Sequence, residues 1–221
     1  FNHGDPGEGS LVNATVYTMM KDRFGRWWIG TFDGLSQHRF NQGEDFFDNY
    51  QRIPGDSTSL SDNSIRCLHL DSQGRLWVGT RTGLNLVIQQ RATDRAKFQH
   101  FGLREGFPND VIHYIEEDAE GIFWIGTNAG LVRFNPDAAL AGQPAIEEIY
   151  TQADGLLSSS FVFRSSSQDS TGQIYLGTGV GLNIFHPQRL LTNQYTPKIA
   201  FTQLEVNGTI ISPGTPAQNI F

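Results

Sequence analysis

Carboxylates recur at regular intervals in this chain and are the first residues that could do chemistry. Asp22, Asp71, Asp118 and Asp169 lie 49, 47 and 51 positions apart, and each opens a D-x-x-G sequence. Calcium binding in a loop requires several oxygen ligands, and each of these turns offers one reliable carboxylate. An Asp at the start of a tight turn can instead accept a hydrogen bond from its own backbone two residues on. The sequence therefore favours turn capping over a metal site.

Other chemically active residues show no catalytic spacing. The six His residues form no H-x-x-H or H-E-x-x-H pattern, which argues against zinc. No G-x-S-x-G elbow and no phosphate-binding loop occurs. Cys67 is the single cysteine, and the equivalent positions in the other repeats are Thr18, Tyr114 and Ser165. We therefore interpret Cys67 as a packed residue and predict no catalytic residue, no metal and no cofactor.

The aspartates belong to a longer repeated motif, D-x-x-G-x-[apolar]-[W/Y]-[I/V/L]-G-T-x-x-G-L. Repeats of this period indicate a modular array. Gly at the fourth motif position suits a turn that needs positive φ. The residues that we assign to the structural framework are Asp22, Gly25, Trp28, Gly30, Asp71, Gly74, Trp77, Gly79, Asp118, Gly121, Trp124, Gly126, Asp169, Gly172, Tyr175 and Gly177.

Each repeat reads as four short strands joined by tight turns. A lead strand precedes the Asp, a second strand carries the Trp, a third follows the last Gly of the motif, and a fourth carries aromatic residues. The expected lead strands are Val16 to Met20, Ile65 to Leu70, Ile112 to Ile115 and Phe163 to Ser166. Hairpin-length turns between short strands predict a four-stranded antiparallel meander.

The second strand is apolar on consecutive residues, as in Trp27-Trp28-Ile29 and Leu76-Trp77-Val78. A half-exposed strand would alternate apolar and polar residues, so both faces of this strand are expected to be covered. Small sheets stacked face to face around an axis, as in a β-propeller, meet this requirement. A helical solenoid and a β-sandwich fit the pattern poorly. We predict an all-β fold of propeller blades with almost no helix, and burial of Trp28, Trp77 and Trp124 between blades.

One set of equivalent positions, here called a column, differs from repeat to repeat, whereas each framework position keeps nearly the same residue type. Tyr17, Arg66, His113 and Arg164 each follow the first apolar residue of a lead strand. The first strand of a propeller blade usually lies nearest the axis, so these side chains are expected near a central channel. They are candidate ligand contacts, and the alternative is that they are ordinary polar residues at strand starts.

The four motifs resemble the two-component regulator propeller repeat. The connectors, Ser59-Leu60-Ser61-Asp62-Asn63-Ser64-Ile65 and Asp154-Gly155-Leu156-Leu157 among them, are similar to those of that family. The resemblance covers about residues 1–190. The fourth copy departs from the pattern with Tyr175 and the polar Ser165-Ser166-Ser167, which is typical of a terminal blade.

The resemblance divides the chain into two parts. Residues 1–192 are expected to form the propeller repeats, with cores near 16–40, 65–90, 112–136 and 163–187. Residues 193–221 resemble a linker and the first strands of the Ig-like domain that follows these propellers in the family. Phe1 to His3 would end a preceding blade, and Pro187 and Pro197 leave the fourth blade without an obvious last strand. We therefore expect open ends and self-association, with homodimers favoured over a closed four-bladed ring.

Two functions stay open on the sequence. The resemblance implies a periplasmic ligand-sensing part of a bacterial membrane signalling protein of two-component or diguanylate cyclase type. It also implies a small polar ligand or oligosaccharide, and contact with the membrane only through the rest of the protein. The alternative is a propeller enzyme such as a lyase or quinoprotein dehydrogenase, since the fold permits either. A net charge of −7 without a basic run argues against nucleic acid as a partner.

Overall fold

The computed structural model describes residues 9–41, 44–89, 91, 94–190, 204–206 and 209–211. The chain divides into two compact units, Phe1–Arg189 and Leu190–Phe221. The α-helix of the first unit, α1 (Pro136–Leu140), has five residues, and no helix within the described ranges is long and apolar enough to cross a membrane.

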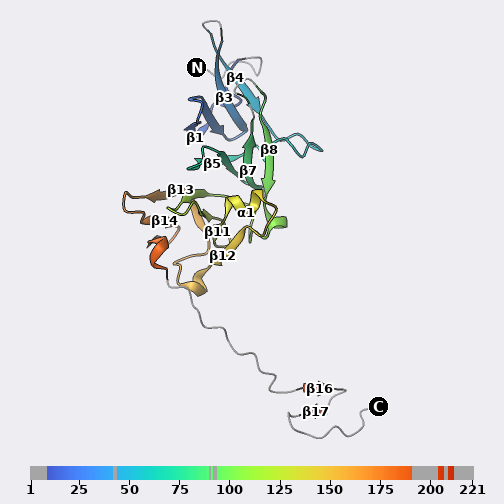
Figure 1. Ribbon diagram of the computed structural model, residues 1–221, viewed down its shortest axis with the longest axis vertical. Coiled ribbons are helices and arrows are strands. Elements are labelled where there is room, and N and C mark those ends of the chain that lie inside the picture. The colour runs from blue at the N-terminus through green and yellow to red at the C-terminus, as the bar shows by residue number, and fades with distance from the viewer. Residues whose placement is uncertain are drawn as a thin grey trace. The chain divides into compact units, whose positions relative to one another are not determined.

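The first unit consists of antiparallel sheets that follow one another along the chain (Figure 1). Blade 1 contains β1 (Val16–Lys21), β2 (Trp27–Thr31), β3 (Gly34–Asn41) and β4 (Glu44–Tyr50). Blade 2 contains β5 (Ile65–Leu70), β6 (Leu76–Thr80), β7 (Gly83–Ile88) and β8 (Lys97–Phe101). Blade 3 contains β9 (Tyr114–Glu117), β10 (Phe123–Gly126), β11 (Leu131–Phe134) and β12 (Ile146–Tyr150). Blade 4 contains β13 (Phe161–Gln168), β14 (Ile174–Thr178) and β15 (Gly181–Phe185).

The prediction of an all-β fold built from blade-like meanders is confirmed. Three sheets have four strands in sequence order, and the fourth has three within the described ranges. Most of the segment between Pro187 and Pro197 lies outside the described residues, so the absence of a last strand there stays a prediction. Short 3-10 turns η1 (Leu103–Glu105), η2 (Gln152–Asp154) and η3 (Pro187–Arg189) complete the connections. Two lead strands differ from their expected bounds by two residues. β9 begins at Tyr114, two residues later than expected, because the Ile112 amide donates to the Thr80 carbonyl of blade 2 instead. β13 extends two residues further at each end than the expected Phe163 to Ser166.

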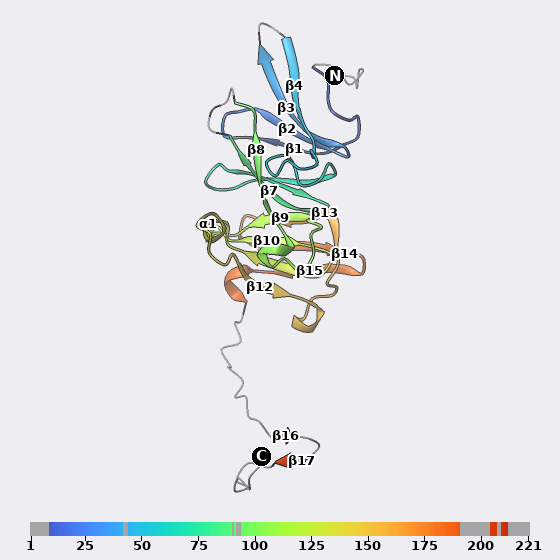
Figure 2. The same ribbon diagram turned by 90° about the vertical axis from the view of Figure 1, so that its right-hand side faces the viewer.

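The lead strands of the blades lie together. β1 packs beside β5, β5 beside β9 and β9 beside β13, and β13 also reaches β5. Figure 1 shows β1, β5 and β13 along one side of the unit, and in Figure 2 the sheets of blades 1, 2 and 3 follow one another from top to bottom. The first strand of each blade is therefore the inner strand, as in a propeller.

Each framework Asp caps its turn and also holds the Trp of the next strand. The Asp71 carboxylate accepts the backbone N–H groups of Gln73 and Arg75 through Oδ1, while Oδ2 accepts the indole N–H of Trp77 at 2.8 Å. The same bonds recur at Asp22 and Asp118, with Trp distances of 2.9 Å in both. In blade 4 the Tyr175 hydroxyl donates to Asp169 at 3.0 Å in place of an indole. Turn capping is thus the role of these aspartates.

The three predicted Trp residues are buried between blades. Trp28 belongs to a core shared by blades 1 and 2, and Trp77 to one shared by blades 2 and 3. Trp124 stacks on Tyr150 at 5.7 Å and meets Phe185 of blade 4 at 4.9 Å. The expectation that the second strand is covered on both faces is wrong for Trp27, which is 44% exposed. Trp27 lies on the face of blade 1 that points away from blade 2, and no blade covers that face in the described ranges.

Both outer faces of the blade series carry exposed apolar side chains. Met19 and Trp27 on blade 1 are exposed, whereas the register-equivalent Leu68 and Leu76 of blade 2 are buried. On blade 4, Leu182 and Ile184 are about half exposed, and their blade 2 equivalents are also buried. The terminal blades therefore present faces of the kind that internal blades bury.

The second unit is described only for β16 (Leu204–Val206) and β17 (Thr209–Ile211), which pair antiparallel. The rest of the expected Ig-like segment, and the expected end of a preceding blade at Phe1 to His3, lie outside the described residues. The Ig-like assignment stays a prediction.

Replacing Trp77 with Ala should lower the free energy of unfolding by roughly 3–5 kcal/mol. The change empties the core between blades 2 and 3 and removes the indole N–H that donates to the Asp71 carboxylate. Trp27→Ala is the matched control: the same side chain, partly exposed, should cost less than about 1 kcal/mol. Urea unfolding followed by circular dichroism measures both. Equal losses in the two variants would contradict the stacking of blades described here.

Candidate functional site

The predicted variable column lies where the lead strands leave regular pairing. In blade 1 the partners of β2 change from Val16 to Thr18, so Tyr17 is the extra residue of a register shift. Arg66 occupies the same place between Ile65 and Cys67. Register shifts of this kind, β-bulges, re-aim side chains and are frequent next to active sites.

Blade 4 has a larger irregularity at the same point. Its pairing passes from Phe161 opposite Thr178 to Ser166 opposite Leu176, so five steps on β13 correspond to two on β14. Arg164 lies in this segment with a φ of 61° and is the single non-glycine residue with positive φ in the described ranges. A left-handed backbone costs an ordinary residue about 1–2 kcal/mol, and such strain concentrates at functional sites.

The column residues of three blades meet at the ring of Phe163. The guanidinium groups of Arg66 and Arg164 lie 5.0 and 5.7 Å from the centre of that ring. Tyr17 contacts the same ring edge-on at 5.4 Å, and Phe32 contacts Tyr17 at 6.4 Å. Blades 1, 2 and 4 therefore contribute to one constellation, although they are far apart in the sequence.

Blade 3 contributes His113, which is buried beside this constellation. Its Nε2 lies 2.6 Å from Oδ1 of Asn128. Burial lowers the pKa of His113, the Asn128 hydrogen bond opposes this, and the positive charge of Arg66 lowers the pKa further. The imidazole is therefore neutral at pH 7. We call Tyr17, Phe32, Arg66, His113, Asn128, Phe163 and Arg164 the inner cluster.

Two polar atoms of the inner cluster are sealed from water without a partner in the described ranges. They are Nε of Arg66 and Nδ1 of His113. Nearly all buried polar groups in proteins have hydrogen-bond partners, and leaving one unsatisfied costs about 1–3 kcal/mol. The inner cluster thus contains one donor, the Nε–H group of Arg66, and one ring nitrogen, Nδ1 of His113, that have no hydrogen-bond partner in the described ranges.

All four predicted column residues belong to the inner cluster, and three further members were missed. Phe32 and Asn128 come from the β2–β3 and β10–β11 turns, and Phe163 precedes Arg164. A signal was present: the residue after the framework Thr is Phe32, Arg81, Asn128 or Gly179, which varies as the first column does. This second variable column lies at the same end of the blades as the first, because the lead strand of each blade starts beside the turn between its second and third strands.

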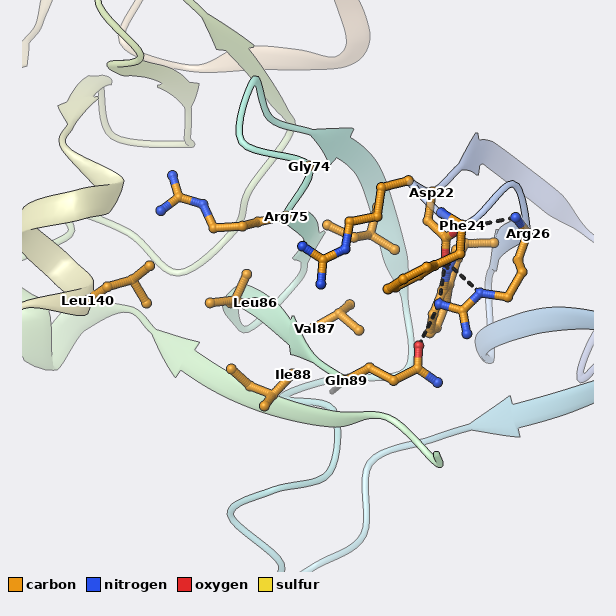
Figure 3. A pocket seen from close by; sticks show the side chains of 13 residues that line it. Asp22, Phe24, Arg26, Gly74, Arg75, Leu86, Val87, Ile88, Gln89 and Leu140 are labelled. Atoms are coloured by element: carbon orange, nitrogen blue, oxygen red, sulfur yellow. Dashed lines mark hydrogen bonds and ion pairs between the residues drawn. The ribbon is translucent and has the colours of Figure 1, made fainter. Parts of the chain in front are cut away.

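A concave surface lies at the opposite end of blades 1 and 2 from the inner cluster. This groove encloses about 390 Å³. Figure 3 shows Leu86, Val87 and Ile88 along its floor, Leu140 of α1 at one end and Phe24 at the other. Arg23 and Arg26 lie 4.7 and 4.8 Å from the Phe24 ring. The sequence signal was the D-R-F-G turn, which has Phe where the other turns have Gln73, Glu120 and Thr171.

The polar groups of the groove are largely committed to the framework. Arg26 pairs with Asp22 at 2.6 Å and donates to Gln89 at 2.7 Å, bonds drawn in Figure 3. Arg75 pairs with Asp137 at 2.6 Å and with Asp71. The inner cluster has no such carboxylate partners in the described ranges. It is therefore the stronger candidate site, although the groove is the more clearly hollowed surface.

The remaining sequence-predicted positions have structural surroundings. The Cys67 sulfur packs against Gly79, where an added Cβ would come within 2.4 Å of it. Burial raises the pKa of the Cys67 thiol to about 12, which disfavours a nucleophilic thiolate. No group of three or more His, Cys, Asp or Glu residues in the described ranges is placed to hold a metal ion.

Comparison with known proteins matches three of the four repeats to one family. The profile of the two-component regulator propeller matches residues 10–33, 59–82 and 106–129. These segments are two-component regulator propeller repeats. Each spans a connector, a lead strand, the D-x-x-G turn and the second strand, so the match contains the framework and both variable columns.

Larger proteins resemble the whole chain. Histidine kinase P4 of Formosa agariphila is 27% identical, over 96% of this chain and 18% of the kinase. The extracellular domain of BT3049 from B. thetaiotaomicron, described as a hybrid two component system, is 26% identical with a TM-score of 0.72, over 96% of this chain and 28% of that one. The BT4673 extracellular domain from the same organism, 22% identical with a TM-score of 0.63, covers 83% and 24% and supports the fold alone. The chain thus spans less than a third of each relative.

Enzymes also occur among the structural neighbours. A catalytically inactive virginiamycin B lyase from Staphylococcus aureus, crystallised with quinupristin, is 14% identical with a TM-score of 0.50, over 83% of this chain and 60% of the lyase. That likeness is one of fold alone.

The left-handed backbone at Arg164 can be tested directly. Arg164→Gly should be roughly 1 kcal/mol more stable than Arg164→Ala, because both remove the guanidinium but only glycine relieves the positive φ. Thermal unfolding of the two variants side by side measures the difference. An alanine variant as stable as the glycine variant would show that the backbone here is unstrained.

Proposed function

We propose that this chain is a sensing part of the extracytoplasmic region of a membrane signalling protein of the two-component type. The proposal is supported by the repeat family and by the similarity over nearly the whole chain to a histidine kinase and to the extracellular domain of BT3049. The extracellular domains among these relatives support a periplasmic location. Ligand binding would shift the balance between two arrangements of the sensor and so change the output of the signalling protein.

The inner cluster is the proposed ligand site. The observation that carries this assignment is the convergence of the variable column residues on Phe163, through register shifts in three lead strands. The exposed ring of Phe32 and the half-buried rings of Tyr17 and Phe163, beside hydrogen-bonding side chains, suit a small polar ligand or an oligosaccharide, which offers both a ring face and hydroxyl groups.

Catalysis is not part of this proposal. General acid–base chemistry needs two groups with matched pKa values at the reacting atoms. In the inner cluster His113 is the single imidazole; burial lowers its pKa, and its Nε2 is engaged by Asn128. The lyase neighbour shows that the fold can host an enzyme, so turnover is an outcome that the experiment must measure.

The test uses the purified 221-residue chain and a panel of neutral and acidic oligosaccharides. A ligand at about 100 times its dissociation constant should add about 2.7 kcal/mol to stability, seen as a rise in Tm. Arg164→Gln should abolish the rise, and Arg104→Gln, on η1 in a connector, should preserve it. The same Arg164→Gln change in the complete signalling protein should abolish the response to that ligand.

Chromatography of the recovered ligand completes this experiment. An unchanged ligand supports sensing. Conversion of the ligand that is lost in a point variant would instead establish an enzyme and overturn the proposal, as would Tm shifts that Arg164→Gln leaves intact.

We further infer that the isolated chain self-associates through its terminal blades. The outer face of blade 4 and the outer face of blade 1 are register equivalents of two faces that pack on each other between internal blades. A second copy is therefore a suitable occupant, since exposed apolar faces and sheet edges drive association.

Light scattering at tens of micromolar should give twice the 24.6 kDa mass of the chain. Replacing Leu182 and Ile184 with Glu should give a monomer of unchanged fold, because charges would be buried at the contact. A monodisperse monomer of the parent chain would refute pairing.

A further inference from the structure

The charge of the inner cluster is opposite to that of the chain. The chain carries a net charge of −7, yet the cluster contains two guanidinium groups around one phenyl ring. Arg26, Arg39, Arg75 and Arg133 each have a carboxylate partner. Arg66 and Arg164, like several other arginines, form no ion pair with a carboxylate among the residues that the structure describes, and these two meet at one aromatic ring.

The two arginines are held in place without an anion. Arg66 and Arg164 both lie against Phe163, whose ring face attracts cations. Phe163 is fixed in turn by the edge-on contact with Tyr17. An aromatic support of this kind orients the guanidinium groups while leaving their N–H donors unused. Guanidinium matches the planar two-oxygen edge of a carboxylate, and it also binds sulfate oxygens.

His113 adds a complementary acceptor. Its pKa is lowered, so the ring is neutral and one nitrogen carries the proton. Because Nε2 lies 2.6 Å from the Asn128 carbonyl oxygen, Nε2 is the donor and Nδ1 is the acceptor. Nδ1 has no partner among the described residues. Because Nδ1 is sealed from water, a ligand hydroxyl or N–H group reaches it only when the side chains that cover it move aside, and can then donate to it.

The rings of Tyr17 and Phe32 supply an apolar wall. They contact each other at 6.4 Å, and Phe32 is exposed on its turn. Cation donors, one neutral acceptor and an aromatic wall together describe a ligand with an acidic group, a hydroxyl group and an apolar ring face.

From these contacts, and resting on the proposed ligand site, we propose that the inner cluster selects anionic ligands: sugar residues that carry a carboxylate or a sulfate ester. Arg66 and Arg164 bind the acidic group, His113 accepts from a neighbouring hydroxyl, and Tyr17 and Phe32 cover the ring face. Neutral sugars bind at the same place at least tenfold more weakly, because both guanidinium groups then keep their charges unpaired.

The test uses small probes, so that it does not depend on the natural sugar. The ¹⁵N-labelled chain is titrated, at constant ionic strength, with galacturonate against galactose, benzoate against benzamide, and methyl sulfate. The readouts are the Arg66 Nε–Hε and His113 ring signals, assigned by their loss in Arg66→Gln and His113→Asn. Galacturonate and benzoate should give saturable shifts, with affinities at least tenfold above those of their neutral partners. Methyl sulfate shows whether sulfate esters are accepted alongside carboxylates.

Variants separate binding from folding. Arg66→Gln and Arg164→Gln should each weaken galacturonate binding at least tenfold, and Arg104→Gln should leave it unchanged. Arg164 is exposed, so its variant should keep the backbone spectrum of the parent even if Arg66→Gln disturbs the fold. Equal affinity for acidic and neutral probes, no saturable shift with any acidic probe, or binding that survives Arg164→Gln would overturn the anion assignment.

Failure here is distinguishable from failure of the proposed function. If neutral oligosaccharides raise the Tm in an Arg164-dependent way and no acidic probe binds, sensing stands and the anion assignment fails. If the acidic probes bind but the complete signalling protein gives no response to any ligand, the anion assignment stands and the sensing role fails.

Discussion

The bond between a turn carboxylate and the indole of the next strand is the constraint on which the blades depend. One Asp fixes the D-x-x-G turn through two backbone N–H groups and, through its other oxygen, the Trp six residues later at 2.8–2.9 Å. The Trp ring is thereby set at a defined depth between two sheets. The same bond recurs in blades 1, 2 and 3, so each of the three Trp rings is anchored to its turn in the same way. Blade 4 keeps the carboxylate but replaces the indole with the Tyr175 hydroxyl. There the Thr171 hydroxyl and the turn amides lower the pKa of Asp169 to about 2, so the anchor stays ionised.

A second constraint comes from the framework glycine after the Trp strand. A Cβ at Gly30, Gly79 or Gly126 would come within 2.2–2.6 Å of a side chain on the adjoining lead strand. Glycine thus lets the third lead-strand residue, Cys67 in blade 2, lie directly on the second strand. In blades 1 and 2 that residue pairs with the glycine and the residue before it, Tyr17 or Arg66, is the extra one in the register. Close packing at the glycine and displacement of the candidate ligand residue are therefore two parts of one local geometry.

The sequence predicted what depends on local pattern and missed what depends on packing between repeats. Strand order, turn type and the burial of Trp77 follow from turn chemistry and apolar periodicity, which act within one repeat. The exposure of Trp27 could not be read from its strand, since the same residues are buried wherever a preceding blade covers them. The position of Tyr17, Arg66, His113 and Arg164 near the axis was predicted, but not their contacts. Those contacts run through Phe163, whose neighbours lie in blades 1 and 2, and the larger register shift that aims it has no composition signal.

The framework and the variable columns divide stability and recognition along each blade. In each blade the start of the lead strand and the turn between the second and third strands lie at one end, and the D-x-x-G turn lies at the other end. At the first end lie the two variable columns. Their side chains take no part in the bonds between the turn Asp, the Trp and the motif Thr, so these residues can change without loss of the core. Thr80 shows how this is possible: its hydroxyl donates to the Gly83 carbonyl at 2.8 Å and closes the turn whatever residue follows. At the other end, Asp, Arg and Trp are committed to one another, and the groove there varies mainly through Arg23 and Phe24. On the proposed assignment of the inner cluster as the ligand site, a change of ligand requires substitutions there and not at the turns that hold the blades together.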